Sequence, residues 1–391
     1  MKRLLEHICV LDLSRLLPGA YCTQLLADLG ARVLKIEQPG PGDYMRRLNP
    51  ALFGALNRNK DSMTLNIKLP RGREILLRLI KESNVFFESF RPGVMDRLGL
   101  GYDAVCNANP EIVYCSLTGY GQAGPGRDRS GHDINYLSVS GALSLNVDPG
   151  ERPMPPPMPL ADLAGGLAAS HAVLAGLLSQ QQGGGGCYID AALTDAALSF
   201  MSPRLVPALH TAKARREDLV RGGAYDVYRT RDRRWVSLGV IEDKFWQNLL
   251  RALGREELGQ DARFKTDQLR CQHRRDLRFI LEPLMEQQDL QVWMDLFNRE
   301  DVPAAPVNRL DEVEQDPHVG FRGMVFQLED HQGRGFKQVA YPASFPGIPS
   351  DRDRPAPAQG RDTRSVLGSL GFGEEDMHAL EKEGVIGSGS L

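Results

Sequence analysis

Three ionisable residues stand where helices are expected to begin, and each has chemistry to offer there. His132 lies in Gly131-His-Asp-Ile-Asn-Tyr136, directly after a Gly-rich loop. A helix N-terminus disfavours the imidazolium, so a histidine at this place tends to stay neutral, which is the form that a general base needs. The simpler alternative is that His132 and Asp133 only form a helix entry, with Asp133 as its cap.

The other two residues are carboxylates at comparable places. Asp162 lies in Pro159-Leu-Ala-Asp-Leu-Ala-Gly-Gly166, and Glu242 lies in Gly239-Val-Ile-Glu-Asp-Lys-Phe245. An acidic residue in the first turn of a helix commonly does no more than cap it or complement its dipole. None of the three residues is specific alone, and their spacing does not show that they converge.

The remaining polar features give weaker indications. Arg91 precedes an expected helix and is either a solvated arginine or an anion contact. Arg46, Arg47, Arg58 and Lys60 form a local basic group that could meet an anionic ligand such as a nucleotide phosphate. The six cysteines include no CxxC pair and no histidine at metal-ligand spacing, so the sequence predicts a reduced cytoplasmic protein without structural zinc.

Length and composition bound the function classes. The 391 residues are enough for two domains, and 42% hydrophobic with 25% charged residues is ordinary globular composition. The formal net charge of −3 argues against a nucleic-acid partner. No apolar run approaches the roughly 18 residues of a membrane-spanning helix, so no membrane partner is expected.

The elements that must position these residues alternate in the first half of the chain. Strands are expected at 8–13, 31–37, 63–67, 84–88, 111–117 and 187–191, and helices at 21–29, 70–81, 132–141, 162–178 and 193–201. This pattern predicts an α/β fold with a Rossmann-like parallel sheet. The first strand–helix turn lacks GxGxxG and the chain lacks a P-loop, which argues against a nicotinamide dehydrogenase or an NTPase.

The composition changes after Ser202. We expect a large domain over 1–202, a linker over 203–224, a smaller α+β domain over 225–325, and a segment over 326–391 that returns to the large domain. In the smaller domain a hairpin at 225–240 and helices at 242–251, 267–286 and 290–299 are expected.

The chain resembles the family III CoA-transferase (CaiB/BaiF) superfamily. Its opening VLDLSRLLPGAYCTQLLADLGARVLKIEQPGPGD carries much of the likeness. Further matching segments lie at 60–68, 90–94, 120–125, 222–226 and 302–307. Within the superfamily, the segments around His132, Asp162 and Glu242 are similar to those of the alpha-methylacyl-CoA racemase branch.

The resemblance implies an interlocked homodimer, in which Glu242 of one chain supports His132 of the other. It implies an acyl-CoA substrate, with CoA as part of that substrate and no further cofactor or metal. The implied substrate and CoA contacts are Thr64, Leu65, Asn66, Ile67, Arg91, Ser130, Gly131, Asp133, Ile134, Asn135 and Tyr136.

The implied reaction is racemisation of 2-methylacyl-CoA thioesters by 1,1-proton transfer. His132 and Asp162 would serve the two faces of the α carbon, and backbone N–H groups at the helix start near Asp162 would donate to the enolate oxygen. The alternative is a CoA-transferase in which Asp162 is the nucleophile, a reaction that does not need His132 or Glu242. A third hypothesis is a catalytically silent acyl-CoA binding protein.

Overall fold

The computed structural model describes residues 3–147, 152–211, 221–330, 333–348 and 354–387. The chain divides into two compact units, one formed by Met1–Pro203 with Phe321–Leu391 and the other by Arg204–Gly320. Within the stretch expected to be a linker, 202–211 forms the helix α10 (Ser202–Thr211), and 212–220 lie outside the described residues.

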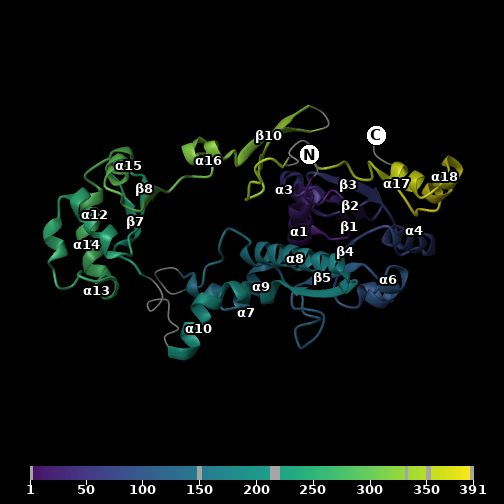
Figure 1. The fold of residues 1–391 in the computed structure, drawn as a ribbon, viewed down its shortest axis with the longest axis horizontal. Coiled ribbons are helices and arrows are strands. Elements are labelled where there is room, and N and C mark those ends of the chain that lie inside the picture. Colours follow the sequence, from purple (N-terminus) through teal and green to yellow (C-terminus); the bar gives the residue numbers. More distant parts are fainter. Residues whose placement is uncertain (1–2, 148–151, 212–220, 331–332, 349–353, 388–391) are drawn as a thin grey trace. The chain divides into compact units, whose positions relative to one another are not determined.

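The first unit is built on a six-stranded parallel sheet with the order β3-β2-β1-β4-β5-β6 (Figure 1). Its strands are β1 (Cys9–Asp12), β2 (Arg32–Glu37), β3 (Lys60–Thr64), β4 (Val85–Glu88), β5 (Val113–Thr118) and β6 (Cys187–Ala192). The α/β fold with a parallel sheet is therefore confirmed. The strand order reverses between β1 and β4, and in open sheets of this kind ligands bind beyond the carboxyl ends of the strands at that point.

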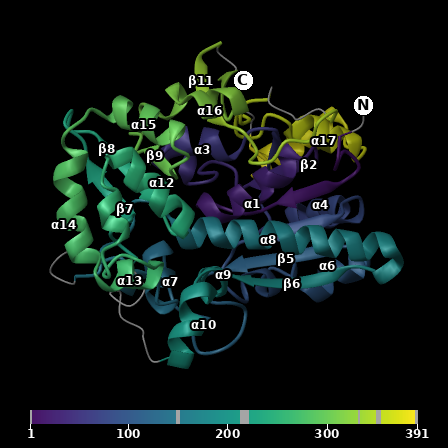
Figure 2. The ribbon, with the colours of Figure 1, turned by 60° about the vertical axis from the view of Figure 1, so that its left-hand side comes forward.

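Helices cover both faces of this sheet, because neighbouring residues of each strand point to opposite faces. Val10 packs into a core with α1 (Leu16–Asp28) and α8 (Leu160–Ser179). Leu11 packs into a second core. The helices of that core are α4 (Pro70–Lys81), α5 (Val94–Arg97), α6 (Tyr102–Ala108), α17 (Thr363–Ser369) and α18 (Glu374–Lys382). Figure 2 shows α8 running along the sheet beside α1.

Small residues let α8 approach its neighbours closely, as its composition predicts. A Cβ atom on Gly166 would lie 2.6 Å from the carbonyl oxygen of Pro18, at the start of α1. A Cβ atom on Gly165 would overlap Leu193, the first residue of α9 (Leu193–Phe200). By length and composition alone residues 160–184 could cross a membrane, but 50% of the most apolar 18-residue window of this stretch is buried within the protein, as in the core helix of many globular domains.

The second unit combines a small antiparallel sheet with helices. Its strands are β7 (Tyr225–Arg229), β8 (Trp235–Gly239) and β9 (Ala304–Pro306), and its main helices are α12 (Asp243–Leu253), α13 (Asp267–Gln272), α14 (Arg274–Met285) and α15 (Leu290–Arg299). The predicted hairpin is present, whereas the single helix expected over 267–286 is two helices that meet at His273. The Pro-rich β9 was not predicted as a strand, and it pairs at the edge of the sheet, where proline is tolerated.

The C-terminal segment belongs to the first unit. It includes a hairpin of β10 (Val325–Glu329) and β11 (Gly335–Val339). The backbone N–H of Thr64 donates to the hydroxyl of Thr363 at 3.0 Å, and that of Asn66 donates to the carbonyl of Val385 at 2.7 Å. These contacts fix the end of β3 and the loop that follows it.

Candidate active site

A cavity of about 500 Å³ lies beyond the carboxyl ends of β1, β4 and β5. Its wall includes residues 15–18, 89–92 and 117–120, which lie at the ends of these strands or shortly after them. His132 and Asp162 both line it. The sheet therefore brings an imidazole and a carboxylate into one cavity at the place where its topology predicts a ligand.

The carboxyl group of Asp162 is unusual within this cavity. Burial raises its pKa to about 7, and the negative charge of Asp133 contributes in the same direction. No lysine or arginine among the described residues forms an ion pair with Asp162. A carboxyl group with a pKa near neutrality exchanges protons readily at physiological pH, which suits a general acid or base.

Asp133 connects the two helices that carry His132 and Asp162. Its Oδ1 accepts hydrogen bonds from the N–H groups of Ala161 at 2.7 Å and Asp162 at 3.1 Å, both in the first turn of α8. Asp133 itself is the first residue of α7 (Asp133–Val139). The expectation that N–H groups near Asp162 donate to an enolate oxygen is therefore wrong for these two, because Asp133 already occupies them.

The start of α7 is held by its own polar groups. The backbone N–H of His132 donates to Oδ1 of Asn135 at 3.0 Å. The hydroxyl of Tyr136 donates to the carbonyl of Gly131 at 2.7 Å, and burial together with Asp162 raises the pKa of Tyr136 to about 12. Arg91 donates to the hydroxyl of Ser130 at 2.8 Å.

The residues predicted to contact CoA fall into three groups. Arg91, Ser130, Gly131 and Tyr136 line the same cavity as His132 and Asp162. Leu65, Asn66 and Ile67 line a second cavity of about 270 Å³. Thr64, Asp133, Ile134 and Asn135 line neither. The hydroxyl of Thr64 accepts from the N–H of Gly387 at 3.0 Å, within the C-terminal segment.

Glu242 belongs to the second unit, where it directly precedes α12 and is exposed. Its pairing with His132 of another chain stays a prediction.

The local basic group does not face a ligand as a whole. Arg46 is paired with both oxygens of Glu37, at 2.6 and 2.8 Å. The guanidinium of Arg58 is buried against Asp28 at 2.6 Å. Lys60 is fully buried against Asp12. For these three residues the expectation of a phosphate contact is wrong, because their charges are already neutralised inside the protein.

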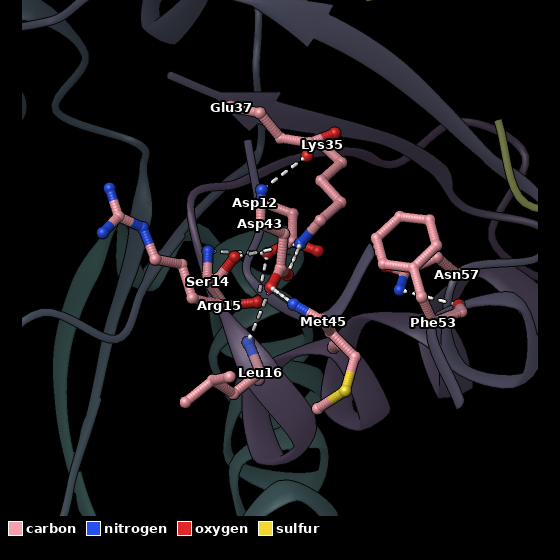
Figure 3. Close-up of polar contacts among 12 residues, drawn as sticks. Asp12, Ser14, Arg15, Leu16, Lys35, Glu37, Asp43, Met45, Phe53 and Asn57 are labelled. Atoms are coloured by element: carbon pink, nitrogen blue, oxygen red, sulfur yellow. Dashed lines mark hydrogen bonds and ion pairs between the residues drawn. The ribbon is translucent and has the colours of Figure 1, made fainter. Parts of the chain in front are cut away.

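Buried charges lie beneath the turn between β1 and α1 (Figure 3). Nζ of Lys35 lies 3.0 Å from Oδ2 of Asp43 and donates to the carbonyl of Ser14 at 2.9 Å. Burial tends to raise the pKa of Asp12, but Lys60 and Lys35 outweigh burial and lower that pKa to about 2. Burial lowers the pKa of Lys60 to about 8.

These groups hold a strained residue at the cavity wall. Leu16 has a φ of 62°, a left-handed conformation that costs a non-glycine residue roughly 1–3 kcal/mol. Its N–H donates to Oδ1 of Asp43 at 3.3 Å, and the N–H of Arg15 donates to the hydroxyl of Ser89 at 3.1 Å. The turn is therefore fixed by hydrogen bonds from two other segments of the chain.

Sequence reasoning missed several polar residues at or beside this cavity. Arg15, Arg127 and Arg129 line it. Glu88, at the end of β4, is buried behind the wall, and burial raises its pKa to about 7. Its carboxyl group accepts from the hydroxyl of Ser116 and from the N–H of Phe90. The sequence feature that could have identified these residues is their position, at the end of a strand, directly after one, or in the Gly-rich loop.

Metal-binding groups of three or more His, Cys, Asp or Glu side chains do not occur among the described residues. The six cysteines are free thiols.

Comparisons with known proteins agree with this fold. The sequence model of CoA-transferase family III matches residues 5–363. The chain is 34% identical to an acyl-CoA transferase of Fusarium pseudograminearum, over 98% of this chain and 88% of that protein. It is 33% identical to human succinyl-CoA:glutarate CoA-transferase, over 98% and 90% of the two chains. It is also 33% identical to human alpha-methylacyl-CoA racemase, over 99% and 98%.

Solved structures show the same architecture. A CAIB/BAIF family protein from Brucella suis superimposes with a TM-score of 0.83 at 29% identity, over 95% of this chain and 100% of that one. A protein from Mycobacterium tuberculosis gives a TM-score of 0.84 at 27% identity, over 93% and 99%. The match of the family across most of the sequence, together with these relatives, shows that the chain belongs to CoA-transferase family III.

Proposed function

We propose that this protein is an enzyme that racemises 2-methylacyl-CoA thioesters by 1,1-proton transfer at the α carbon. The observation that carries the proposal is the shared cavity of His132 and Asp162, in which the pKa of Asp162 is raised to about 7. An imidazole and a carboxyl group on the wall of one cavity are the pair of groups that a two-base reaction at a carbon acid requires.

In this reaction one base removes the α proton and the electron pair of the C–H bond moves into the thioester carbonyl, giving an enolate. The other base, in its protonated form, then returns a proton to the opposite face of the same carbon. His132 and Asp162 exchange these roles when the direction of the reaction is reversed. Since Asp133 occupies the N–H groups of Ala161 and Asp162, the enolate oxygen takes its hydrogen bonds from other groups of the cavity wall, and Arg91 is a cationic donor there.

CoA transfer is the second candidate, and the names of the relatives favour it, since several of them are CoA-transferases. In this reaction the carboxylate of Asp162 attacks a donor thioester and releases CoA thiolate, leaving an aspartyl anhydride. The thiolate then attacks the aspartyl carbonyl and releases the donor acid, leaving an aspartyl thioester. An acceptor carboxylate attacks this thioester, which releases CoA thiolate and forms a second anhydride. The thiolate finally attacks the acceptor's acyl carbon, which gives the new thioester and frees the Asp162 carboxylate. The imidazole of His132 has no step in this sequence.

Incubation with one stereoisomer of a 2-methylacyl-CoA in deuterated water tests the proposal. We expect deuterium at the α carbon together with loss of optical purity, and we expect His132→Ala to abolish both. Movement of CoA to an added free acid without α exchange would overturn racemisation and support transfer. Asp195→Asn, an exposed carboxylate on α9, serves as the control that leaves exchange unchanged.

The assembly is a second part of the proposal. We propose an interlocked homodimer in the cytoplasm, in which Glu242 of one chain orients His132 of the other. Mixing inactive His132→Ala and Glu242→Ala proteins after unfolding and refolding them together should restore exchange, because some mixed dimers then hold one intact site. A monomer in sedimentation equilibrium would contradict this arrangement.

A further inference from the structure

Arg15 lies on the wall that two cavities share. The larger cavity contains His132 and Asp162, and the smaller one is lined by Asn66, Ile67 and Lys68, among other residues. Arg15 and Phe90 line both cavities. A ligand that occupies the two cavities together therefore passes Arg15.

The guanidinium of Arg15 lies close to two aromatic rings. Its Cζ lies 5.4 Å from the centre of the Tyr44 ring and 5.1 Å from that of the Phe90 ring. Its Nη1 donates to the hydroxyl of Tyr44 at 3.2 Å. Cation–π contacts orient a guanidinium but leave most of its N–H groups free for an anion.

Arg15 also has no carboxylate partner among the described residues. This contrasts with Arg46 and Arg58, which are paired with Glu37 and Asp28. Figure 3 shows the side chain of Arg15 pointing away from the buried charges beneath the turn. A positive charge that the protein itself leaves uncompensated, at the junction of two cavities, is suited to an anionic part of the ligand.

We propose that Arg15 binds the diphosphate of the acyl-CoA substrate. The smaller cavity then takes the nucleotide end, and the larger one takes the pantetheine arm and the thioester. In CoA the diphosphate lies between these two parts, as Arg15 lies between the two cavities. The planar guanidinium would donate two parallel hydrogen bonds to phosphate oxygens. This inference rests on the proposed acyl-CoA substrate and holds for racemisation and for transfer alike.

The backbone of the turn supports this role. Arg15 is flanked by Ser14, whose carbonyl accepts from Lys35, and by Leu16, whose N–H donates to Asp43. The N–H of Arg15 itself is bound by Ser89. With all three residues fixed, the guanidinium is placed before the ligand arrives, so little ordering is needed on binding.

Binding measurements test the inference without any turnover. Titration calorimetry with CoA, dephospho-CoA and pantetheine should show that Arg15→Ala weakens CoA and dephospho-CoA by a similar factor of roughly 10- to 100-fold, the range for hydrogen bonds to charged groups. Pantetheine, which has no diphosphate, should bind wild type and variant equally. Arg364→Ala, an exposed arginine on α17 that lines neither cavity, is the matched control.

Each outcome is decisive. Unchanged CoA affinity in Arg15→Ala overturns the inference, as does a loss confined to CoA, because dephospho-CoA lacks only the 3′-phosphate. Arg15→Lys keeps the charge without the planar fork and should bind with intermediate affinity, so it provides the test if Arg15→Ala does not fold. The wild-type protein could also bind CoA through Arg15 and yet neither exchange α protons nor transfer CoA. That result would refute the proposed function and leave the inference about Arg15 intact.

Discussion

Lys60 and Asp12 neutralise each other beneath the first strand–helix turn, whereas Arg15 and Asp162, on the wall of the neighbouring cavity, have no partner of opposite charge among the described residues. The two regions use the same kinds of side chain and lie in the same unit. In the buried group the charges hold backbone carbonyls and N–H groups in place. In the cavity they remain available to a ligand.

In this protein, the presence or absence of an oppositely charged partner therefore distinguishes structural charges from functional ones. Paired buried charges contribute to stability only as a set, because removal of one leaves the other without compensation. Unpaired charges at a cavity are costly to the folded protein and are explained by what they bind or transfer. Substitutions in the two regions should therefore have opposite effects on stability and activity.

Asp162→Asn should give the largest effect on activity. We expect α exchange or CoA transfer to fall by roughly 10²- to 10⁴-fold, the range for loss of a positioned acid or base. The same variant should be more stable than wild type at pH 8, where wild type must bury the carboxylate. At pH 5 the carboxyl group is protonated in the folded protein and the difference should shrink. Melting temperatures of both proteins at the two pH values check this, and a destabilised variant at pH 8 would contradict it.

Lys60→Met should show the reverse behaviour. Removing this buried cation leaves Asp12 without one of its two lysine neighbours, and we expect the free energy of unfolding to fall by about 3–5 kcal/mol. Urea unfolding measures it, with Arg364→Ala expected to change stability by less than about 1 kcal/mol as a surface pair. The double variant Asp12→Asn, Lys60→Met should lose less than the sum of the single variants. If Lys60→Met and Arg364→Ala lowered the free energy of unfolding equally, the buried charges would not differ from surface pairs in their contribution to stability.

The pH dependence of activity should follow Asp162. As a nucleophile, or as the base for one of the two stereoisomers, it must be deprotonated, so kcat/KM with that substrate should rise by up to about tenfold per pH unit below pH 7 and level off above it. In Asp133→Asn the rise should move to lower pH, since the charge of Asp133 helps to raise this pKa. Asp128→Asn, an exposed neighbour, should leave the profile in place. A profile unmoved in Asp133→Asn would remove Asp133 as a cause.

Glu88 should give the smallest effect of the four predictions, because it combines features of the buried charges and of the cavity charges. It is buried without a lysine or arginine partner among the described residues, yet it does not line the cavity. Its pKa is raised to about 7, so its contribution to stability is present at low pH and is lost as pH rises through 7. Glu88→Gln keeps an acceptor for the N–H of Phe90 and should flatten the dependence of stability on pH between about 4.5 and 7, where only the folded protein keeps this carboxyl group protonated. An unchanged slope would show that Glu88 does not titrate there.

Much of the first unit could be predicted from the sequence, because strand and helix periods alternate clearly and turn residues separate them. The positions of His132 and Asp162 at helix starts followed from the same reasoning. Their convergence did not, since it depends on the strand order and on the hydrogen bonds of Asp133 to α8. Sequence reasoning treated Lys60 and Arg58 as ligand contacts because charge gives no sign of burial.

Arg15 illustrates the opposite limit. It stands in the turn Leu13-Ser-Arg-Leu-Leu17, within the opening segment that carries much of the family likeness, but nothing in this turn marks Arg15 as a ligand contact. Its importance arises from the rings of Tyr44 and Phe90, which come from distant parts of the chain. Such a residue is found only when the cavities are known.

Asp133 has a further consequence for how this site can change. It is the first residue of α7, and its side chain accepts hydrogen bonds from the first turn of α8. A single short side chain therefore links the helix start that carries His132 to the helix that carries Asp162. The distance between the imidazole of His132 and the carboxyl group of Asp162 therefore depends on the hydrogen bonds of Asp133. Loss of this one carboxylate should therefore disturb the starts of both helices at once.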